Sequence, residues 1–415
     1  MFRSAIWSLL IIPGTLLGMS ALPAQGQAPE WTLPAWVMDQ PAIDVYRRTE
    51  KSKPANLNAL KANPANSAQL AVGSKLVHFY VSQLLLPANQ NLPKDVTDRF
   101  LGDLLGPGIS EPVRKGMLKE VATVIPTLMD HPEPLVRMNA VLFLSYCSED
   151  KGAPGIPPTP PRPVIQNRTV LGAIAKDRNQ PWIVRNTAVL GLQRMLQDGT
   201  TISHPELTNP VRSDIATDLL QVLSDALELK TSDPESWWYR MRVVDALGYT
   251  ERIDLTSGQA AIAEALLERI SDPNEHFVVR SQATVSLSQL PWTAAVNEPL
   301  VMEAVGKLIV DLAAAQAKSP RAPVWKQCFG RVYLAFRPKS QLQANRKWGF
   351  LFKTSPVPTA TNSLWKAAFP LLKPFIESKD PPPAIADTAV APVQKLLETK
   401  VANRKIHPQT TFALP

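Results

Sequence analysis

Histidine and cysteine are the side chains of this sequence best suited to bind a metal or act as a nucleophile. The two cysteines, Cys147 and Cys328, are 181 residues apart, which excludes a Cys-x-x-Cys motif. Gly-rich phosphate loops and Gly-x-Ser-x-Gly elbows do not occur. None of the five histidines has another within helical ligand spacing: His78, His131, His204, His276 and His407. The sequence therefore predicts no catalytic, cofactor-binding or metal-binding residue, and a protein that is not an enzyme.

Both cysteines lie in apolar stretches typical of helices. We expect two separate buried thiols that pack as small hydrophobic side chains, not a disulfide. Asn167 begins the triplet Asn-Arg-Thr, which fits an N-glycosylation sequon but is a common triplet by chance.

Positive charge is concentrated in one segment. The formal net charge is +8, yet the segment from Leu312 to Ile376 holds eleven basic residues and no acidic one. Repulsion on this scale is most easily tolerated beside a polyanion or an acidic protein surface. The simpler interpretation is a basic surface that serves solubility alone. The candidate partner-binding residues of this segment are Arg321, Trp325, Arg331, Arg337, Lys339, Arg346, Lys347 and Trp348.

The N-terminus has the pattern of a secretory signal peptide. Arg3 precedes an apolar run over residues 5–21, and small and polar residues follow, which predicts cleavage after Ala24. The alternative is an uncleaved membrane anchor, for which the run is short. No other stretch is apolar for long enough to span a bilayer. We therefore expect an exported protein of the periplasm, envelope or extracellular space, for which nucleic acid is an unlikely partner.

A degenerate motif recurs through the middle of the chain. It consists of an aspartate, a proline-bearing turn, an apolar pair, an arginine, a small or apolar residue three positions on, and an apolar residue seven positions on. Successive arginines, with Lys326 in a weaker fifth copy, are 48, 55, 40 and 46 residues apart, an interval that suits two helices and two turns. The motif aspartates and arginines are Asp130, Arg137, Asp177, Arg185, Asp233, Arg240, Asp272 and Arg280.

This motif resembles the Asp-turn-Val-Arg-x-x-Ala signature of the HEAT repeat family over about residues 111–336. The resemblance implies a right-handed α-solenoid of about five HEAT-like helix pairs with irregular N- and C-terminal helical caps. It also implies that the motif aspartates and arginines form a ladder of ion pairs and hydrogen bonds between neighbouring repeats. The third copy departs from the signature, with Val243 in the alanine position, and the fifth lacks the aspartate.

Helical periodicity predicts an all-α fold. Residues 25–69 are an irregular Pro/Asn-rich segment with one short helix at 42–49, and residues 70–110 form a cap built on a helix at 69–86. Residues 337–415 form a basic extension with helices at 363–376 and 385–401 and a loose tail after Lys405. The first helices of the repeats are expected at 111–129, 163–175, 211–229, 258–270 and 298–315.

Aromatic residues recur where the second helix of each repeat begins. One interpretation is that they fill space between repeats, and the other is that they form a row of partner anchors along one edge. Trp237 and Trp238 are candidates for partner binding, because adjacent helical residues cannot both face the same core.

Three functions remain open from the sequence. The first is a non-enzymatic scaffold that binds a protein or polymer along an extended surface. The second is an anion-binding envelope module that uses the basic C-terminal third to bind a cell-wall polymer, lipid head groups or an acidic protein. The third is an enzyme whose site is assembled from distant residues.

Overall fold

The computed structural model describes residues 31–410, except for residues 154, 156–158, 200–206, 230–235, 338–347, 354–358 and 379–381. The predicted signal peptide and the candidates Asp233, Lys339, Arg346 and Lys347 lie outside the described residues. Within these ranges the protein is all-α, as predicted: no strand is present, and two isolated β-bridges occur in one loop.

The N-terminal part holds two helices that the sequence did not predict. The predicted ones are α1 (Gln40–Val45), continued by a π-helical turn (Tyr46–Glu50), and α3 (Ser67–Leu85). The helices missed are α2 (Pro54–Leu60) and α4 (Pro93–Leu104). Each begins with a proline, which favours the first helical position. In α4 the buried residues Val96, Phe100 and Leu104 recur every four positions and form one apolar stripe.

The middle of the chain consists of helix pairs at the positions that the repeat predicted. The bounds are α5 (Glu111–Val124), α6 (Pro134–Tyr146), α7 (Asn167–Lys176), α8 (Trp182–Asp198), α9 (Asn209–Leu229), α10 (Trp237–Leu247), α11 (Ala261–Ser271), α12 (Phe277–Gln289), α13 (Glu298–Lys318) and α14 (Val324–Phe336).

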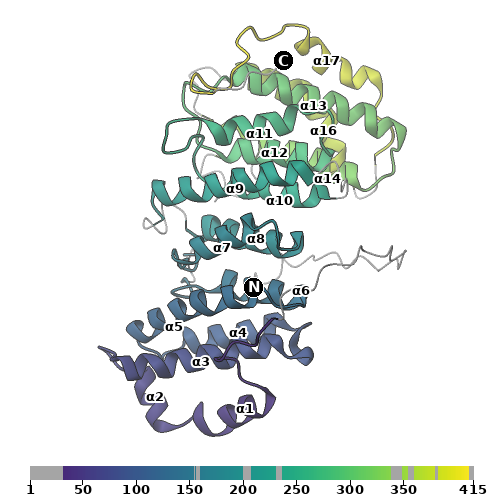
Figure 1. Cartoon of the computed structure of the whole chain (residues 1–415). Helices are drawn as coiled ribbons and strands as arrows, with labels where there is room; N and C mark the ends of the chain where they lie inside the picture. The colour runs from purple at the N-terminus through teal and green to yellow at the C-terminus, as the bar shows by residue number, and fades with distance from the viewer. Residues whose placement is uncertain are drawn as a thin grey trace.

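These helices pack against their neighbours in two series. The second helices follow one another, since α6 contacts α8, α8 contacts α10, α10 contacts α12 and α12 contacts α14. The first helices α7, α9, α11 and α13 contact one another in the same order. Figure 1 shows the resulting stack, which runs from α1 and α2 at one end to α17 at the other.

The residue three positions after each motif arginine lies at the contact between helices. Ala140, Ala188, Val243 and Ala283 are all fully buried. A small side chain at this position lets neighbouring helices approach closely. In the third copy the larger side chain of Val243 is buried at the same position. The two cysteines are free and buried, as predicted.

The C-terminal helices extend the stack. Helix α16 (Thr359–Glu377) packs against α13 and α14, and α17 (Asp387–Leu397) packs against α13. The prediction of a loose tail after Lys405 is wrong as far as Thr410. The Asn297 N–H donates to the Ile406 carbonyl at 2.8 Å, and Ile406 and Thr410 are buried. The tail therefore packs at the N-terminus of α13.

Candidate functional site

Three motif arginines are buried between consecutive helix pairs, and each binds an acid that follows it. Arg185 Nη2 lies 2.9 Å from Asp225 Oδ2 on α9. Arg240 binds Glu275, just before α12, through Nε and Nη2 at 3.0 to 3.2 Å.

The third pair completes the series. Arg280 Nη2 lies 2.8 Å from Asp311 Oδ2 on α13. The Nε of Arg185 and of Arg280 also donates to a carbonyl at the end of the preceding helix, Ala175 at 2.8 Å and Ile270 at 3.0 Å. Each arginine thus joins its own helix pair to the next. The first motif arginine, Arg137, is half-buried and donates to Gln180 Oε1 at 3.3 Å.

The motif aspartates have a role different from the one that the resemblance implied. Asp177 Oδ1 accepts a hydrogen bond from the Asn179 N–H at 3.0 Å, and Asp272 Oδ1 accepts one from the Asn274 N–H at 2.9 Å. Both therefore shape the turn before the second helix, and Asp130 is exposed. The acids of the ladder are Asp225, Glu275 and Asp311, because each arginine side chain extends toward the following helix pair.

The aromatic residues at the start of the second helices contact one another across consecutive pairs. The Trp182 and Trp238 ring centroids are 4.4 Å apart, and Trp237 stacks on His276 at 4.4 Å and 10°. Trp237 and Trp238 are both half-buried, while Trp182 is 43% exposed. Packing between consecutive helix pairs therefore accounts for most of this edge.

Two tryptophans leave the set of candidate partner-binding residues. Trp325 is 7% exposed and Trp348 is 8% exposed. Trp325 Nε1 donates to the Ser319 carbonyl at 2.8 Å, and Trp348 packs edge-on against Tyr249. Buried rings of this kind belong to the core and cannot serve as docking anchors on the surface.

The basic segment divides into internal and exposed residues. Arg331 is half-buried, its Nε donates to Gln282 Oε1 at 2.8 Å, and burial lowers its pKa. Its cation is thus engaged inside the stack. The described basic residues of this segment that are exposed are Lys318, Arg321, Lys326, Arg337, Lys366 and Lys373.

Lys353 is a half-buried cation of the same segment, and its surroundings predict a pH-dependent stability. Its Nζ donates to the Leu290 carbonyl at 2.6 Å, and burial lowers its pKa to about 7. An unfolded chain holds this proton up to about pH 10.4. The unfolded state therefore binds more protons between these two values, and stability rises with pH across that window.

We expect Lys353→Met to raise the Tm by a few degrees at pH 6 to 7 and to flatten the rise in Tm between pH 7 and 9.5. Thermal denaturation followed by circular dichroism at stepped pH measures both effects. Lys373→Met, at an exposed lysine, is the matched control. Parallel pH curves for the wild type and Lys353→Met would contradict the assignment.

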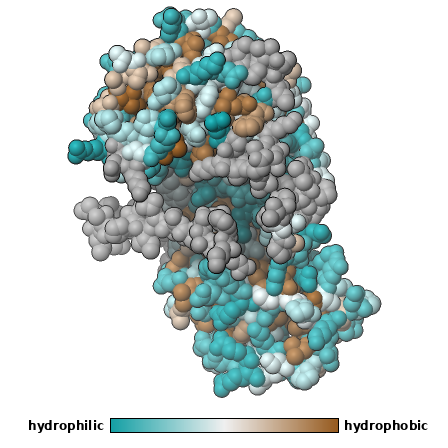
Figure 2. Space-filling view, turned by 180° about the vertical axis from the view of Figure 1, so that it is seen from behind, coloured by the Kyte–Doolittle hydropathy of each residue, from teal (hydrophilic) through white to brown (hydrophobic). Residues whose placement is uncertain are grey.

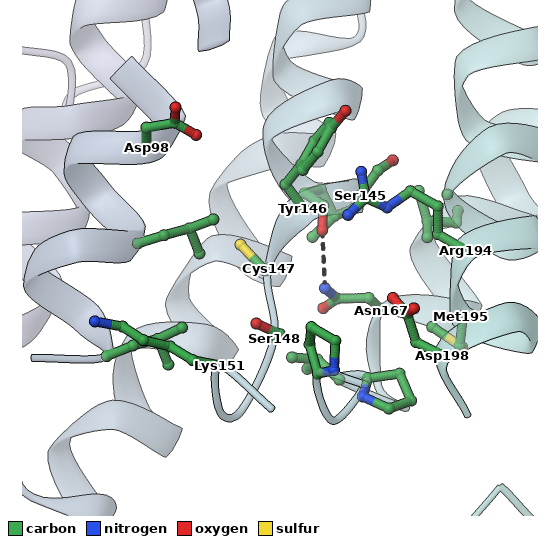
Figure 3. Close-up of a pocket in the computed structure, with 18 of the residues that line it drawn as sticks. Asp98, Ser145, Tyr146, Cys147, Ser148, Lys151, Asn167, Arg194, Met195 and Asp198 are labelled. Atoms are coloured by element: carbon green, nitrogen blue, oxygen red, sulfur yellow. Dashed lines mark hydrogen bonds between the residues drawn. The ribbon is translucent and has the colours of Figure 1, made fainter. Parts of the chain in front are cut away.

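A cleft of about 430 Å³ opens beside α4, α6 and α8. It exists because the connection between α6 and α7, residues 147–166, is long and folds back on itself. The bridges Ser148 to Pro163 and Ala153 to Thr159 hold it as a small hairpin, and Asp150 Oδ1 accepts hydrogen bonds from the Gly152 and Arg162 N–H groups. Figure 3 shows the side chains that line the cleft between this connection and the end of α8.

Two polar side chains of the cleft have unused hydrogen-bonding capacity. Asn167 is 2% exposed, and its Nδ2 donates to the Leu144 carbonyl at 3.2 Å. Its Oδ1 is buried without a hydrogen-bond partner, a state that costs about 1–3 kcal/mol. Arg194 lies over the Tyr146 ring with Cζ 3.6 Å from the ring centroid. The same burial makes Asn167 a poor glycan acceptor in the folded protein.

No sequence motif predicts this cleft. Connections between packed helices usually have about 2–8 residues, and longer ones are often functional. The length of the segment between α6 and α7 was the available signal. Its position beside α8 depends on the packing of three helix pairs, which no local pattern encodes.

No group of three or more histidine, cysteine, aspartate or glutamate side chains in the described part of the chain could hold a metal ion. Nor does any described helix combine the length and apolar character needed to cross a membrane. Comparison with protein families, curated proteins and solved structures gave no match. The class that the fold defines is an all-α protein of stacked helices.

Proposed function

We propose that the chain is an exported, non-enzymatic scaffold, built as a right-handed α-solenoid of about five HEAT-like helix pairs with helical caps. The observation that supports this most is the repeated buried ladder of Arg185 with Asp225, Arg240 with Glu275, and Arg280 with Asp311. Each pair joins one helix pair to the next at an equivalent position, as expected of a repeat array.

A stacked array of this kind offers a long surface for a protein or polymer partner. Figure 2 shows that the coloured residues on the face opposite Figure 1 are mostly hydrophilic, with apolar residues scattered among them. Surfaces of this composition bind through many shallow polar contacts.

The second candidate function is anion binding by the basic C-terminal third. It is favoured by the exposed cations that flank α14, with Arg321 before the helix and Arg337 after it. The burial of Trp325 and Trp348 removes both tryptophan candidates from this surface. An anionic envelope polymer, lipid head groups or an acidic protein would be the partner.

Retention of native envelope partners on immobilised full-length protein distinguishes the two functions. A scaffold is expected to retain the same partners in wild type and in Arg321→Glu/Arg337→Glu, and to hold them at 0.5 M NaCl. An anion-binding module is expected to lose them in the variant and at high salt, because exposed charges are screened within about 10 Å at 0.1 M salt. Absence of any retained partner in both proteins contradicts both functions.

Export has its own test. The N-terminal sequence of the protein recovered from its source is expected to begin after Ala24. Recovery of the uncleaved chain in the cytosol would contradict the proposed localisation.

A further inference from the structure

Arg194, near the end of α8, lines the cleft, and its guanidinium lies flat against an aromatic ring. The contact of its guanidinium with the Tyr146 ring fixes its plane. Within the described ranges, this guanidinium makes no hydrogen bond or ion pair with another side chain or backbone group. A planar fork of N–H donors fixed in this way matches the two oxygens of a carboxylate.

Asn167 offers the complementary group, an acceptor. Its Nδ2 is already engaged by the Leu144 carbonyl, so the side-chain orientation is fixed and Oδ1 is the atom without a partner. Figure 3 shows this amide between Cys147 and Ser148 on one side and Arg194 and Asp198 on the other. A ligand that donates an N–H or O–H here would satisfy the buried oxygen.

The rest of the lining restricts the charge and shape of the ligand. Lys151 adds a second cation, while Asp98 and Asp198 add two carboxylates, so the cleft has no excess of positive charge that would suit a phosphate or a polyanion. Asp98 is itself paired with Lys94. The remaining wall is apolar and includes Leu101, Leu105, Leu144, Leu171 and Met195.

A single carboxylate, a neighbouring N–H donor and an apolar side chain are the three features of the last residue of a peptide. We propose that this cleft binds the carboxyl-terminal residue of a peptide that ends in an apolar side chain. Arg194 receives the carboxylate, Asn167 Oδ1 accepts the N–H of that residue, and the leucines and Met195 surround its side chain. This site is separate from the extended surface of the proposed scaffold, and either proposal can fail without the other.

Fluorescence anisotropy with the full-length protein tests the site. The probes are fluorescein-labelled pentapeptides of sequence Gly-Ser-Gly-Ala-X, where X is Leu, Val or Phe, each as the free acid and as the carboxamide. At least one free acid is expected to bind about 10-fold or more tightly than its carboxamide, because the amide loses the bidentate contact with the guanidinium. Equal binding of acid and amide, or no binding of any acid up to about 1 mM, would overturn the proposal.

Two variants locate the binding in the cleft. Arg194→Gln is expected to weaken the free acid about 10-fold and to leave the carboxamide unchanged. Gly102→Phe is expected to abolish binding, since a Cβ at Gly102 meets no atom within 4 Å and the new ring would enter the cleft. Replacing glycine inside α4 also favours the helix, so folding is retained. Arg99→Gln, at an exposed arginine of α4 outside the lining, is the control. Wild-type affinity in Gly102→Phe would exclude the cleft as the site.

Discussion

Glu275→Gln is expected to lower the free energy of unfolding by about 3–5 kcal/mol, because it leaves the Arg240 guanidinium buried without a counter-charge. The Glu275 side chain is fully buried and Arg240 is 2% exposed. The carboxylate accepts three hydrogen bonds from the guanidinium and one from the His276 N–H at 2.7 Å. Glutamine preserves the shape of the side chain, so the fall in the free energy of unfolding measures the effect of removing the charge. Urea denaturation followed by circular dichroism measures it.

Two further variants separate the charge from the packing at this contact. In Arg240→Met/Glu275→Leu we expect most of the loss to be recovered, since replacing a buried ion pair by apolar side chains is often neutral. Glu228→Gln removes the same charge from the exposed pair between Arg178 and Glu228, and is expected to leave the urea midpoint unchanged within error. A Glu275→Gln midpoint equal to that of Glu228→Gln would show that the buried pair does not stabilise the stack.

Much of the helical stack could be predicted from the sequence, because it is encoded locally. The arginine and the small residue three positions later mark one turn of each second helix, and they are visible without knowledge of the partner helix. The acids that bind these arginines could not be predicted. Asp225 and Asp311 lie within long helices and carry no motif, so only the packing of one pair on the next selects them.

For the candidate sites too, the sequence does not reveal which residues pack against one another. Composition identified Trp325 and Trp348 because they lie among basic residues, but composition does not reveal which side of a helix is covered. Arg194 had no motif to distinguish it, and Asn167 stood out only as the start of a sequon; both line one cleft because α8 packs against α7. Residues brought together in this way are invisible to a search along the chain.

Phe375→Ala is expected to destabilise the C-terminal end of the stack by about 3–5 kcal/mol, the usual range for removing a buried phenylalanine ring. The rings of Phe375 on α16 and Phe329 on α14 are stacked with centroids 4.1 Å apart, and both are buried. This contact links the C-terminal helices to the helix pairs before them. We therefore expect α16 and α17 to exchange their amide hydrogens faster in either Phe375→Ala or Phe329→Ala, as measured by hydrogen exchange and mass spectrometry.

The double variant tests whether the two rings act as one unit. Phe329→Ala/Phe375→Ala is expected to be less destabilised than the sum of the two single variants, because the second substitution removes a ring whose partner is already gone. Phe352→Ala is the control, since that ring is 40% exposed. If α16 and α17 kept wild-type exchange rates in Phe329→Ala, these helices would form a unit of their own. Because each helix of the stack packs against its neighbours, loss at this junction is instead expected to spread into α13 and α14 before it reaches α8.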